Sequence, residues 1–409
     1  MKKQSNTPKI RFHNYKELWE CDDLKNIFGT IRNAFVGTAT PYYVEKGHFY
    51  LESNNVKNGK INYNSQIFIN DEFYEKQRDK WLKTNDIVMV QSGHVGHTAV
   101  ITKELNNTAA HALIVFTDYK KEVNPHFLNY QFQSSSKRKK LDLISTGNTI
   151  KHILASEMKS FKMDFPTVEE QSAIGSLFRT LDDLLTSYKD NLANYQSLKT
   201  TMLSKMFPKA GRTVPEIRLD GFEGEWEVVN LGTLIENYDE VISGTSGFPI
   251  ATSSRKGLYL QNDYFEGGRT GIDLTLDFHR VPIGYVTYRH MSDDSIFKFN
   301  KNNFETDVLV SKEYPVFISN DSSDIDFLLY HLNNSRLFLR FSTMQKLGGT
   351  RVRLYYKNLI TYKIAVPTVK EQQAIGAYFS ILDNLIATHQ EKISQLETLK
   401  KKLLQDMFI

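Results

Sequence analysis

The sequence has 409 residues, of which 40% are hydrophobic and 12% aromatic, and its formal net charge is +4. This composition predicts a globular chain of more than one domain, and the mild charge permits a nucleic-acid partner without requiring one. No apolar run approaches the ~18 residues that a membrane-spanning helix needs, so we expect a soluble, cytoplasmic protein with no membrane partner. The single cysteine, Cys21, excludes an internal disulfide and fits a reducing compartment.

Two passages of the chain are written twice. PKIRFHNYKELWECDDL, from Pro8, resembles PEIRLDGFEGEWEVVNL, from Pro215. FPTVEEQSAIGSLFRTLDDLL, from Phe165, resembles VPTVKEQQAIGAYFSILDNLI, from Val366, and this likeness continues without gaps at an offset of 201 residues. The whole chain is therefore a duplicated unit. The middle segments of the two copies, about 29–144 and 236–345, share no evident similarity. We predict domains at 1–165 and 209–365, each followed by a repeated helix, at 166–208 and 366–409.

The two middles are predicted to be mixed and rich in strands. Short apolar or β-branched runs bounded by Gly, Asn and Asp predict strands at 87–90, 98–102, 113–117, 259–260 and 283–288. HFLNYQF, from His126, and DFLLYHLNN, from Asp326, predict short helices at matching places in the two units. A polar or basic stretch and then a glycine follow each of these helices. The fold class is therefore α+β.

Both copies of the longer repeat are predicted to be long helices. Thr167 with Glu170, and Thr368 with Glu371, have the spacing of a capping box, and Pro208 ends the first helix. Apolar residues recur at the spacing of a heptad seam, which drifts by one residue where Asn191 falls on a seam position. The predicted seam contains Ile174, Leu177, Leu181, Leu184, Tyr188, Tyr195, Leu198 and Met202, and in the second copy Ile375, Tyr378, Leu382, Leu385, Leu396, Leu399 and Leu403.

Two interpretations of these helices are open. Each helix could be the core helix of its own domain, which is the usual role of a single amphipathic helix. Alternatively, the two could pair as an antiparallel coiled-coil rod, since ~40 residues make a helix of about 60 Å, far longer than the usual ~12 residues. The length, the faithful duplication and the matching seams favour a rod that acts as a spacer between two variable domains, in a pseudo-two-fold arrangement.

With these features, the chain resembles the specificity subunit of a Type I restriction-modification system. The resemblance rests on two variable domains, each followed by a glycine turn and a Pro-Thr-Val-x-Glu-Gln helix with Ile-Gly, and it covers the whole chain. It implies that each variable domain is a target-recognition domain for one half of an asymmetric, bipartite DNA target. It also implies that the helices set the spacer and dock two methyltransferase subunits, which restriction subunits join to form the endonuclease complex.

The sequence does not display the motifs that catalysis by this chain would need. Gly59-Lys60 is followed by Ile61 rather than completing a phosphate loop, and Asn124-Pro125-His126 is only a partial match to the Asn-Pro-Pro-aromatic motif of adenine methylation. We therefore expect a subunit without catalysis or a cofactor of its own, while S-adenosylmethionine, ATP and Mg²⁺ belong to the partner subunits. The two histidines of SGHVGH, from Ser92, lack the companion ligands of a metal site and better fit a turn between strands.

Side chains for contact with double-stranded DNA are chosen by chemistry: Arg, Lys, Asn, Gln and His for base edges, and basic or hydroxyl groups for phosphates. The candidates of the first domain are Arg32, Tyr42, Ser92, His94, His97, Lys137, Arg138, Lys139 and Lys140. Those of the second are Thr245, Ser246, Arg255, Lys256, Arg289, His290, Lys346, Arg351 and Arg353. The run from Lys137 to Lys140 is the strongest cluster, although a charge run is commonly a solvated loop.

Two other classes of protein remain open. A bivalent scaffold that binds proteins rather than DNA would also need duplicated helices. A nuclease or methyltransferase that works alone would need motifs that the sequence does not display. The target bases, the spacer length and the methylated positions cannot be read from the sequence.

Overall fold

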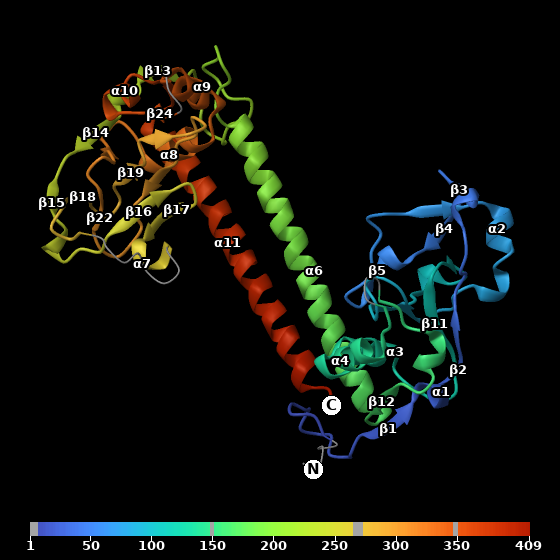
Figure 1. Cartoon of the computed structure of the whole chain (residues 1–409). Coiled ribbons are helices and arrows are strands. Elements are labelled where there is room, and N and C mark those ends of the chain that lie inside the picture. The colour runs from blue at the N-terminus through green and yellow to red at the C-terminus, as the bar shows by residue number, and fades with distance from the viewer. Residues whose placement is uncertain (1–6, 148–150, 265–272, 347–350) are drawn as a thin grey trace. The chain divides into compact units, whose positions relative to one another are not determined.

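The computed structural model describes residues 7–147, 151–264, 273–346 and 351–409 (Figure 1). The chain forms two compact units: unit 1 comprises Met1–Lys189 and Glu391–Ile409, and unit 2 comprises Asp190–Gln390. The two predicted long helices are present as α6 (Val168–Lys205) and α11 (Val369–Asp406), and each unit contains a part of both. The boundaries proposed between domains and helices stay a prediction.

Unit 1 is built around a four-stranded antiparallel sheet with the order β2-β11-β8-β9. A second sheet has the order β10-β4-β7-β3, and two-stranded pairs join β1 to β12 and β5 to β6. The elements are β1 (Glu20–Asp23), α1 (Leu24–Ile27), β2 (Phe28–Asn33), β3 (Tyr43–Val44), β4 (His48–Leu51), β5 (Val56–Lys57), β6 (Lys60–Ile61), β7 (Ile67–Ile69), α2 (Asp71–Glu75), β8 (Ile87–Val90), β9 (Thr98–Val100), β10 (Ala109–Ala110), β11 (Leu113–Tyr119), α3 (Pro125–Gln133), α4 (Ser135–Ile144), α5 (Ala155–Met158) and β12 (Lys162–Phe165).

Unit 2 contains a four-stranded antiparallel sheet of the same kind, with the order β14-β23-β19-β21. A three-stranded sheet, β15-β18-β22, and the pairs β13-β25, β16-β17 and β20-β24 complete it. The elements are β13 (Glu227–Asn230), β14 (Ile235–Tyr238), β15 (Val241–Ser243), β16 (Ala251–Ser254), β17 (Gly257–Leu260), α7 (Gln261–Tyr264), β18 (Asp277–Val281), β19 (Val286–Tyr288), β20 (Met291–Ser292), β21 (Phe299–Lys301), β22 (Val308–Ser311), β23 (Val316–Ser319), α8 (Ile325–Asn334), α9 (Arg336–Met344), β24 (Val352–Arg353), α10 (Tyr356–Leu359) and β25 (Lys363–Val366).

Most of the predicted elements are present. Strands β8, β9, β11 and β17 and helices α3 and α8 lie where the sequence predicted them. The strand predicted over 283–288 is shorter, because Gly284 turns the chain with a φ of +85° and Ile283 is exposed, so pairing begins at Val286. The basic stretch after α3 is not a loop but helix α4, whose start is capped by the Ser134 hydroxyl.

The central sheet of unit 1 is buried on both faces. Ile87 and Met89 of β8 belong to the core cluster that contains Phe127 of α3, whereas Val88 and Val90 belong to the opposite cluster. Alternate residues of a strand point to opposite faces, so a strand covered on both sides needs an unbroken apolar run. This explains why the segment reads Ile-Val-Met-Val without polar alternation.

The duplicated passages form the frame that starts each long helix. Strand β1 pairs with β12, opposing Glu20 to Phe165, and β13 pairs with β25, opposing Glu227 to Val366. In each case the second strand runs directly into α6 or α11. Within the described residues, no helix is long and apolar enough to cross a membrane.

Candidate functional site

The start of each long helix is locked by the residues that the repeat preserves. The Thr167 hydroxyl accepts the Glu170 amide at 3.4 Å, as predicted for a capping residue. The carboxylate of Glu170 does not complete a capping box, because it binds the Arg11 guanidinium through two hydrogen bonds of 2.7 Å. Glu371 binds Arg218 in the same way, at 2.8 and 2.7 Å, so the Arg and Glu shared by the repeats form a buried ion pair in each unit.

The Gln and Gly of the repeat position the short helix that follows the central sheet. In unit 1, Gln171 donates to the Pro166 carbonyl and accepts the amide of Asn124, the residue that caps α3. A Cβ on Gly175 would lie 2.9 Å from the Asn124 side-chain oxygen, so only glycine permits this approach. Unit 2 repeats the arrangement with Gln372, Gly376 and Asp324.

The seam of the long helices is displaced from the predicted one at alternate positions. On α6, buried or half-buried side chains recur four and three residues apart at Ile174, Phe178, Leu181, Leu185, Tyr188, Leu192, Tyr195, Lys199 and Met202. On α11 they are Ile375, Phe379, Leu382, Ile386, His389, Ile393, Leu396, Lys400 and Leu403. In unit 1 Asp182 meets Lys400 and Lys189 meets Glu397, so the helices run antiparallel. In unit 2 Lys199 meets Asp383 and Tyr195 meets His389, which gives the same direction.

Several predicted rod residues are therefore corrected. Leu184, Leu198 and Leu399 are 42%, 37% and 44% exposed, and Leu177 and Leu385 are only half-buried. Each lies next to the observed seam position, because in a helix with 3.6 residues per turn both i+3 and i+4 lie near the face of residue i. Ile174, Leu181, Ile375 and Leu382 are buried, and Leu396 is half-buried.

A polar cluster that the sequence reading missed lies on this seam in each unit. In unit 1, Asp182 accepts a hydrogen bond from Tyr130 of α3 at 2.8 Å and forms an ion pair with Lys400 at 2.5 Å. The Lys400 ammonium also lies 5.5 Å from the centre of the Tyr130 ring. Burial raises the pKa of Tyr130, and the Asp182 charge acts in the same direction, so the phenol keeps its proton.

Unit 2 contains the matching cluster. Asp383 accepts from Tyr330 at 2.8 Å and pairs with Lys199, whose ammonium lies 5.5 Å from the Tyr330 ring centre. The sequence could have predicted this cluster, because Asp182 aligns with Asp383 and Lys199 aligns with Lys400 at the offset of 201 residues.

The DNA candidates of unit 1 divide into exposed and buried groups. His94, Lys139 and Lys140 are exposed. His97 is half-buried, accepts the Asn58 amide at 3.2 Å and lies 3.2 Å from a guanidinium nitrogen of Arg138. Burial, reinforced by the Arg138 charge, lowers the pKa of His97 to about 4, so its imidazole is neutral at pH 7.

Lys137 is a correction to the predicted basic cluster. Its side chain is 0% exposed, forms an ion pair with Asp164 and donates to the Lys162 carbonyl at 3.1 Å. Burial lowers the pKa of Lys137 below its ordinary value. Because α4 turns this residue towards β12, the run from 137 to 140 splits between the interior and the surface.

Arg32 and Tyr42 have structural contacts in unit 1. Arg32 of β2 is half-buried, and its guanidinium donates to the Lys80 carbonyl at 3.0 Å. The Tyr42 ring stacks on Phe73 with 4.1 Å between ring centres.

The loop that follows β8, residues 91–97, lies at the centre of the remaining unit 1 candidates. Ser92 makes an isolated bridge to His152, and Gly93 and Gly96 have φ values of +79° and +77°. The loop joins antiparallel strands β8 and β9, as predicted for SGHVGH. We call residues 91–97 with Arg138 and His152 the β8 face.

The corresponding loop of unit 2 follows β19 and lies beside the four candidate arginines of that unit. Arg255 binds Asp294 through contacts of 2.7 and 2.5 Å, and Arg351 binds Asp293 at 2.9 Å. Arg353 is brought beside this loop because it pairs with Met291 across β20 and β24. We call Arg255, Arg289, Asp293, Asp294, Arg351 and Arg353 the β19 face.

His290 is a further correction, because it is buried rather than available to a base. Its side chain is 4% exposed and stacks on Tyr355, with 5.6 Å between ring centres. Burial lowers its pKa; the Glu313 charge opposes this shift, and Arg353 and Arg289 reinforce it. The other unit 2 candidates, Thr245, Ser246, Lys256 and Lys346, are exposed.

The two faces carry guanidinium, imidazole and carboxylate groups. Among the residues that the structure describes, no group of three or more His, Cys, Asp or Glu side chains is arranged to hold a metal ion. The β8 and β19 faces lie at the same place in two duplicated frames, after the third strand of the sheet order and beside the segment that precedes α5 or α10. Their side chains differ, as expected of a protein with two unlike recognition surfaces.

The fold and its two faces thus define a protein with two related units, each of which carries one candidate binding surface. The chain belongs to the family described as Type I restriction modification DNA specificity domain, whose model matches residues 39–194 and 248–398. Recognition of the DNA target by the two domains is the role of this family. The resemblance proposed from the sequence is therefore confirmed.

Relatives that match the whole chain or half of it support this assignment. A Methanocaldococcus jannaschii protein, named as a type I restriction enzyme (MjaX) specificity subunit, is 23% identical over 98% of this chain and 95% of its own length. The EcoBI specificity subunit of Escherichia coli is 24% identical over 49% of this chain and 44% of its own. The crystal structure of a Type I restriction-modification S subunit from M. genitalium has the same fold, with a TM-score of 0.61 and 14% identity over 98% of this chain and 99% of that one.

Proposed function

We propose that each unit reads one half of an asymmetric, bipartite DNA target, unit 1 through the β8 face and unit 2 through the β19 face. The observation that carries the proposal is the repetition of one frame around two faces with different side chains. Because base edges are read by the side chains that reach them, unlike faces imply unlike half-sites.

The β19 face has the chemistry to read base edges directly. Arginine donates two parallel hydrogen bonds to guanine, and a carboxylate accepts from cytosine. Asp293 and Asp294 hold Arg351 and Arg255 in place, while Arg289 and Arg353 have no ion-pair partner among the described residues. These two arginines are therefore the side chains of this face best suited to contact DNA.

The β8 face has a different set of donors and acceptors. Because His97 Nδ1 already accepts the Asn58 amide, the neutral ring carries its proton on Nε2 and offers a hydrogen-bond donor, and the exposed His94 lies beside it, with 6.3 Å between ring centres. Gly93 is exposed and leaves no side chain to hold a DNA backbone away from the loop, whereas Gly96 is buried against Leu141. We expect this face to read its half-site by histidine and main-chain contacts.

The helix pair sets the distance between the half-sites and docks two methyltransferase subunits in this proposal. Large apolar side chains remain exposed on both helices, namely Leu184 and Leu399 in unit 1 and Leu198 and Ile381 in unit 2. Exposed apolar side chains that gather on one element mark surfaces for partners. Restriction subunits then join the assembly, and S-adenosylmethionine, ATP and Mg²⁺ act in the partner subunits, so this chain supplies no catalytic group.

Binding to DNA by variants of the β19 face tests the proposal. Arg353→Gln should weaken binding to a duplex that carries the methylated host motif by about 1–3 kcal/mol, since one guanine contact is lost. Lys312→Gln, an exposed lysine outside the face, is the matched control. Equal affinities of both variants and the unaltered chain, measured with random competitor DNA, would remove the β19 face from the proposal.

A protein-binding scaffold without DNA recognition is the second candidate, and the duplicated helices with their exposed leucines are the observation in its favour. A gel shift separates the two. A scaffold of this kind would bind the methyltransferase subunit and leave every duplex unshifted, whether or not that subunit is present.

A further inference from the structure

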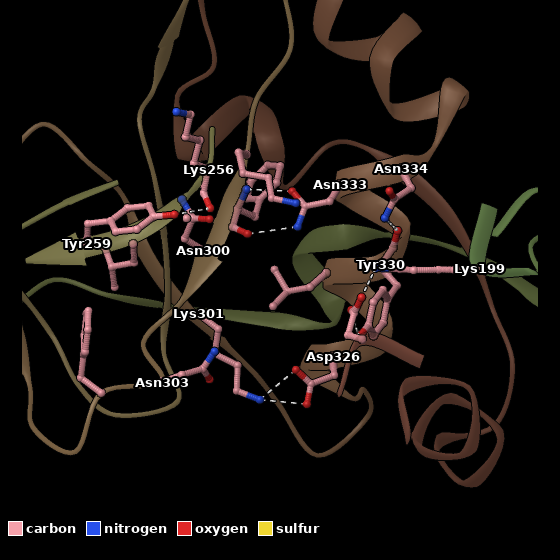
Figure 2. Close-up of a pocket in the computed structure, with 17 residues that line it drawn as sticks. Lys199, Lys256, Tyr259, Asn300, Lys301, Asn303, Asp326, Tyr330, Asn333 and Asn334 are labelled. Atoms are coloured by element: carbon pink, nitrogen blue, oxygen red, sulfur yellow. Dashed lines mark hydrogen bonds and ion pairs between the residues drawn. The ribbon is translucent and has the colours of Figure 1, made fainter. Parts of the chain in front are cut away.

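A polar pocket of about 490 Å³ lies within unit 2, and its lining includes none of the arginines of the β19 face. Its walls come from the β16–β17 hairpin, β21 and the residues after it, one side of α8, and Lys199 and Asp383 of the long helices. Figure 2 shows the pair formed by Lys301 and Asp326 at one side of the pocket and Tyr330, beside Lys199, at another. This volume falls within the range of sites for small ligands.

The charges that line the pocket do not balance. Its ionisable side chains are Lys199, Lys256, Lys298, Lys301, Asp326 and Asp383, together with two tyrosines. Lys199 is neutralised by Asp383, and Lys301 lies 2.8 Å from both carboxylate oxygens of Asp326. The ammonium groups of Lys256 and Lys298 have no hydrogen-bond or ion-pair partner among the residues that the structure describes.

Lys298 is the more informative of the two, because it is half-buried. A partly buried ammonium without a partner is unfavourable. Burial lowers the pKa of Lys298, and the neighbouring charge of Lys199 lowers it further. An anion beside Lys298 would relieve both effects.

The same place in unit 1 is covered by the chain itself. Asn129 of α3 donates to the Gly59 carbonyl at 2.9 Å, and a Cβ on Gly59 would lie 2.4 Å from the Gln133 amide nitrogen. Lys60 of the same hairpin donates to the Asp182 carbonyl at 3.2 Å. The matching residues of α8, Leu329 and Asn333, line the open pocket instead. The pocket is therefore a feature of unit 2 that its duplicate does not share.

We propose that this pocket binds a phosphate group, with Lys298 and Lys256 as the groups that neutralise it. The excess of two positive charges selects an anion, and the exposed amide of Asn303 adds a neutral donor. The phosphate can belong to the backbone of bound DNA, in which case the inference rests on the proposed function, or to a free nucleotide, in which case it does not. Lys256 follows Arg255 in the β16–β17 turn, so a DNA strand at the β19 face would pass close to the pocket.

Lysine modification followed by mass spectrometry tests the proposal on the full chain. The rate of acetylation at Lys298 is measured with no addition, with inorganic phosphate, with dAMP and with a duplex of random sequence. At about ten times the dissociation constant, a bound phosphate leaves roughly a tenth of the sites free, so the rate at Lys298 should fall about tenfold. Lys312, which lies outside the pocket, should react at an unchanged rate.

The separate additions identify the source of the phosphate. Protection by the duplex alone indicates the DNA backbone, and protection by dAMP or inorganic phosphate indicates a nucleotide site. Lys298 that stays equally reactive under all conditions, or protection that is equal at Lys312, would overturn the proposal. A gel shift of the same duplex reports on the proposed function independently, so a chain that binds DNA with Lys298 unprotected loses only the pocket. The same spectra report the rate of acetylation at Lys256, which a bound phosphate should also protect. Lys298→Met should abolish that protection, whereas Lys298→Arg should keep it.

Discussion

Asp182 of α6 and Lys400 of α11 form an ion pair of 2.5 Å in which the side chains are only 7% and 14% exposed. The pair formed by Lys199 and Asp383 repeats it in unit 2, and a separation of 17 residues divides the two pairs on each helix. A buried polar pair costs stability unless its partner is in register, so it selects one alignment of two helices over its neighbours. The buried pair of unit 1 therefore fixes the register of the helix pair, and the unit 2 pair, with side chains 24% and 43% exposed, repeats its contact closer to the surface.

Removing the charge of Asp182 should be costly. Asp182→Asn leaves the Lys400 ammonium without a counter-ion and should lower the free energy of unfolding by about 2–4 kcal/mol. Asp183→Asn, at the exposed neighbouring position, should change it by less than about 0.5 kcal/mol. Urea denaturation measures both, and a double-mutant cycle with Lys400→Met isolates the coupling. Indistinguishable stabilities of the two asparagine variants would show that the pair does not hold the helices.

Adjacent leucines on α6 distinguish the observed seam from the predicted one. Leu185 is 8% exposed and Leu184 is 42% exposed. Leu185→Asp buries an unpaired carboxylate and should lower the free energy of unfolding by about 3–5 kcal/mol, whereas Leu184→Asp should cost less than about 0.5 kcal/mol. If thermal denaturation showed Leu184→Asp to be the more destabilising of the two variants, the seam predicted from the sequence would be correct. Leu184→Asp should instead weaken binding of the methyltransferase subunit.

The helices and the duplicated frame were predictable, because capping residues, length and periodicity all pointed to the same structure. The phase of the seam was not, since leucine occupies both 184 and 185 and only the partner helix decides between them. The likeness of the two central sheets was also hidden. Strands such as β8 and β19 need only apolar residues at buried positions, so different sequences satisfy the same pairing.

The candidate DNA residues show where local sequence reading fails. Lys137 and His290 have the right chemistry, but the fold buries both. Conversely, Arg255 is about 100 residues away from Arg351 and Arg353 in the sequence, and they come together only because β20 pairs with β24 and Asp294 and Asp293 bind Arg255 and Arg351. Charge runs report composition along the chain, whereas a binding face depends on strand pairing.

A methyl group at Gly175 should disturb the junction between α3 and α6. A Cβ there would approach the Asn124 side-chain oxygen to 2.9 Å and the Phe127 amide to 3.3 Å, which displaces the cap of α3. Gly175→Ala should lower the free energy of unfolding by about 1–3 kcal/mol, although alanine is the better helix former. Ser176→Ala, at the exposed next position, should be neutral or slightly stabilising. A stabilising effect of Gly175→Ala in calorimetry would contradict the role given to this glycine.

His331 should make unit 2 sensitive to acid. Its side chain is buried, with Nε2 2.8 Å from the Tyr362 hydroxyl oxygen, and burial lowers its pKa from 6.5 to about 4. As the pH falls, the unfolded chain therefore takes up a proton before the folded one. The free energy of unfolding should decrease by roughly 3 kcal/mol between about pH 6.5 and about pH 4, and this group has no effect on it above that window. His331→Phe should flatten this part of the stability profile, while His13→Gln, at an exposed histidine, should not. Parallel profiles for His331→Phe and the unaltered chain would refute the assignment.

The central claim is that two units of one chain read separate halves of one DNA target, and sequencing of methylated motifs tests it most directly. Residues 29–144 of unit 1 are exchanged for the corresponding segment of another specificity subunit, and the chain is expressed with its methyltransferase subunit. Because the β8 face lies mostly in this segment and the β19 face lies wholly outside it, one half of the methylated motif should change, and the other half and the gap should stay the same. A motif that changed in both halves, or in neither, would contradict the account.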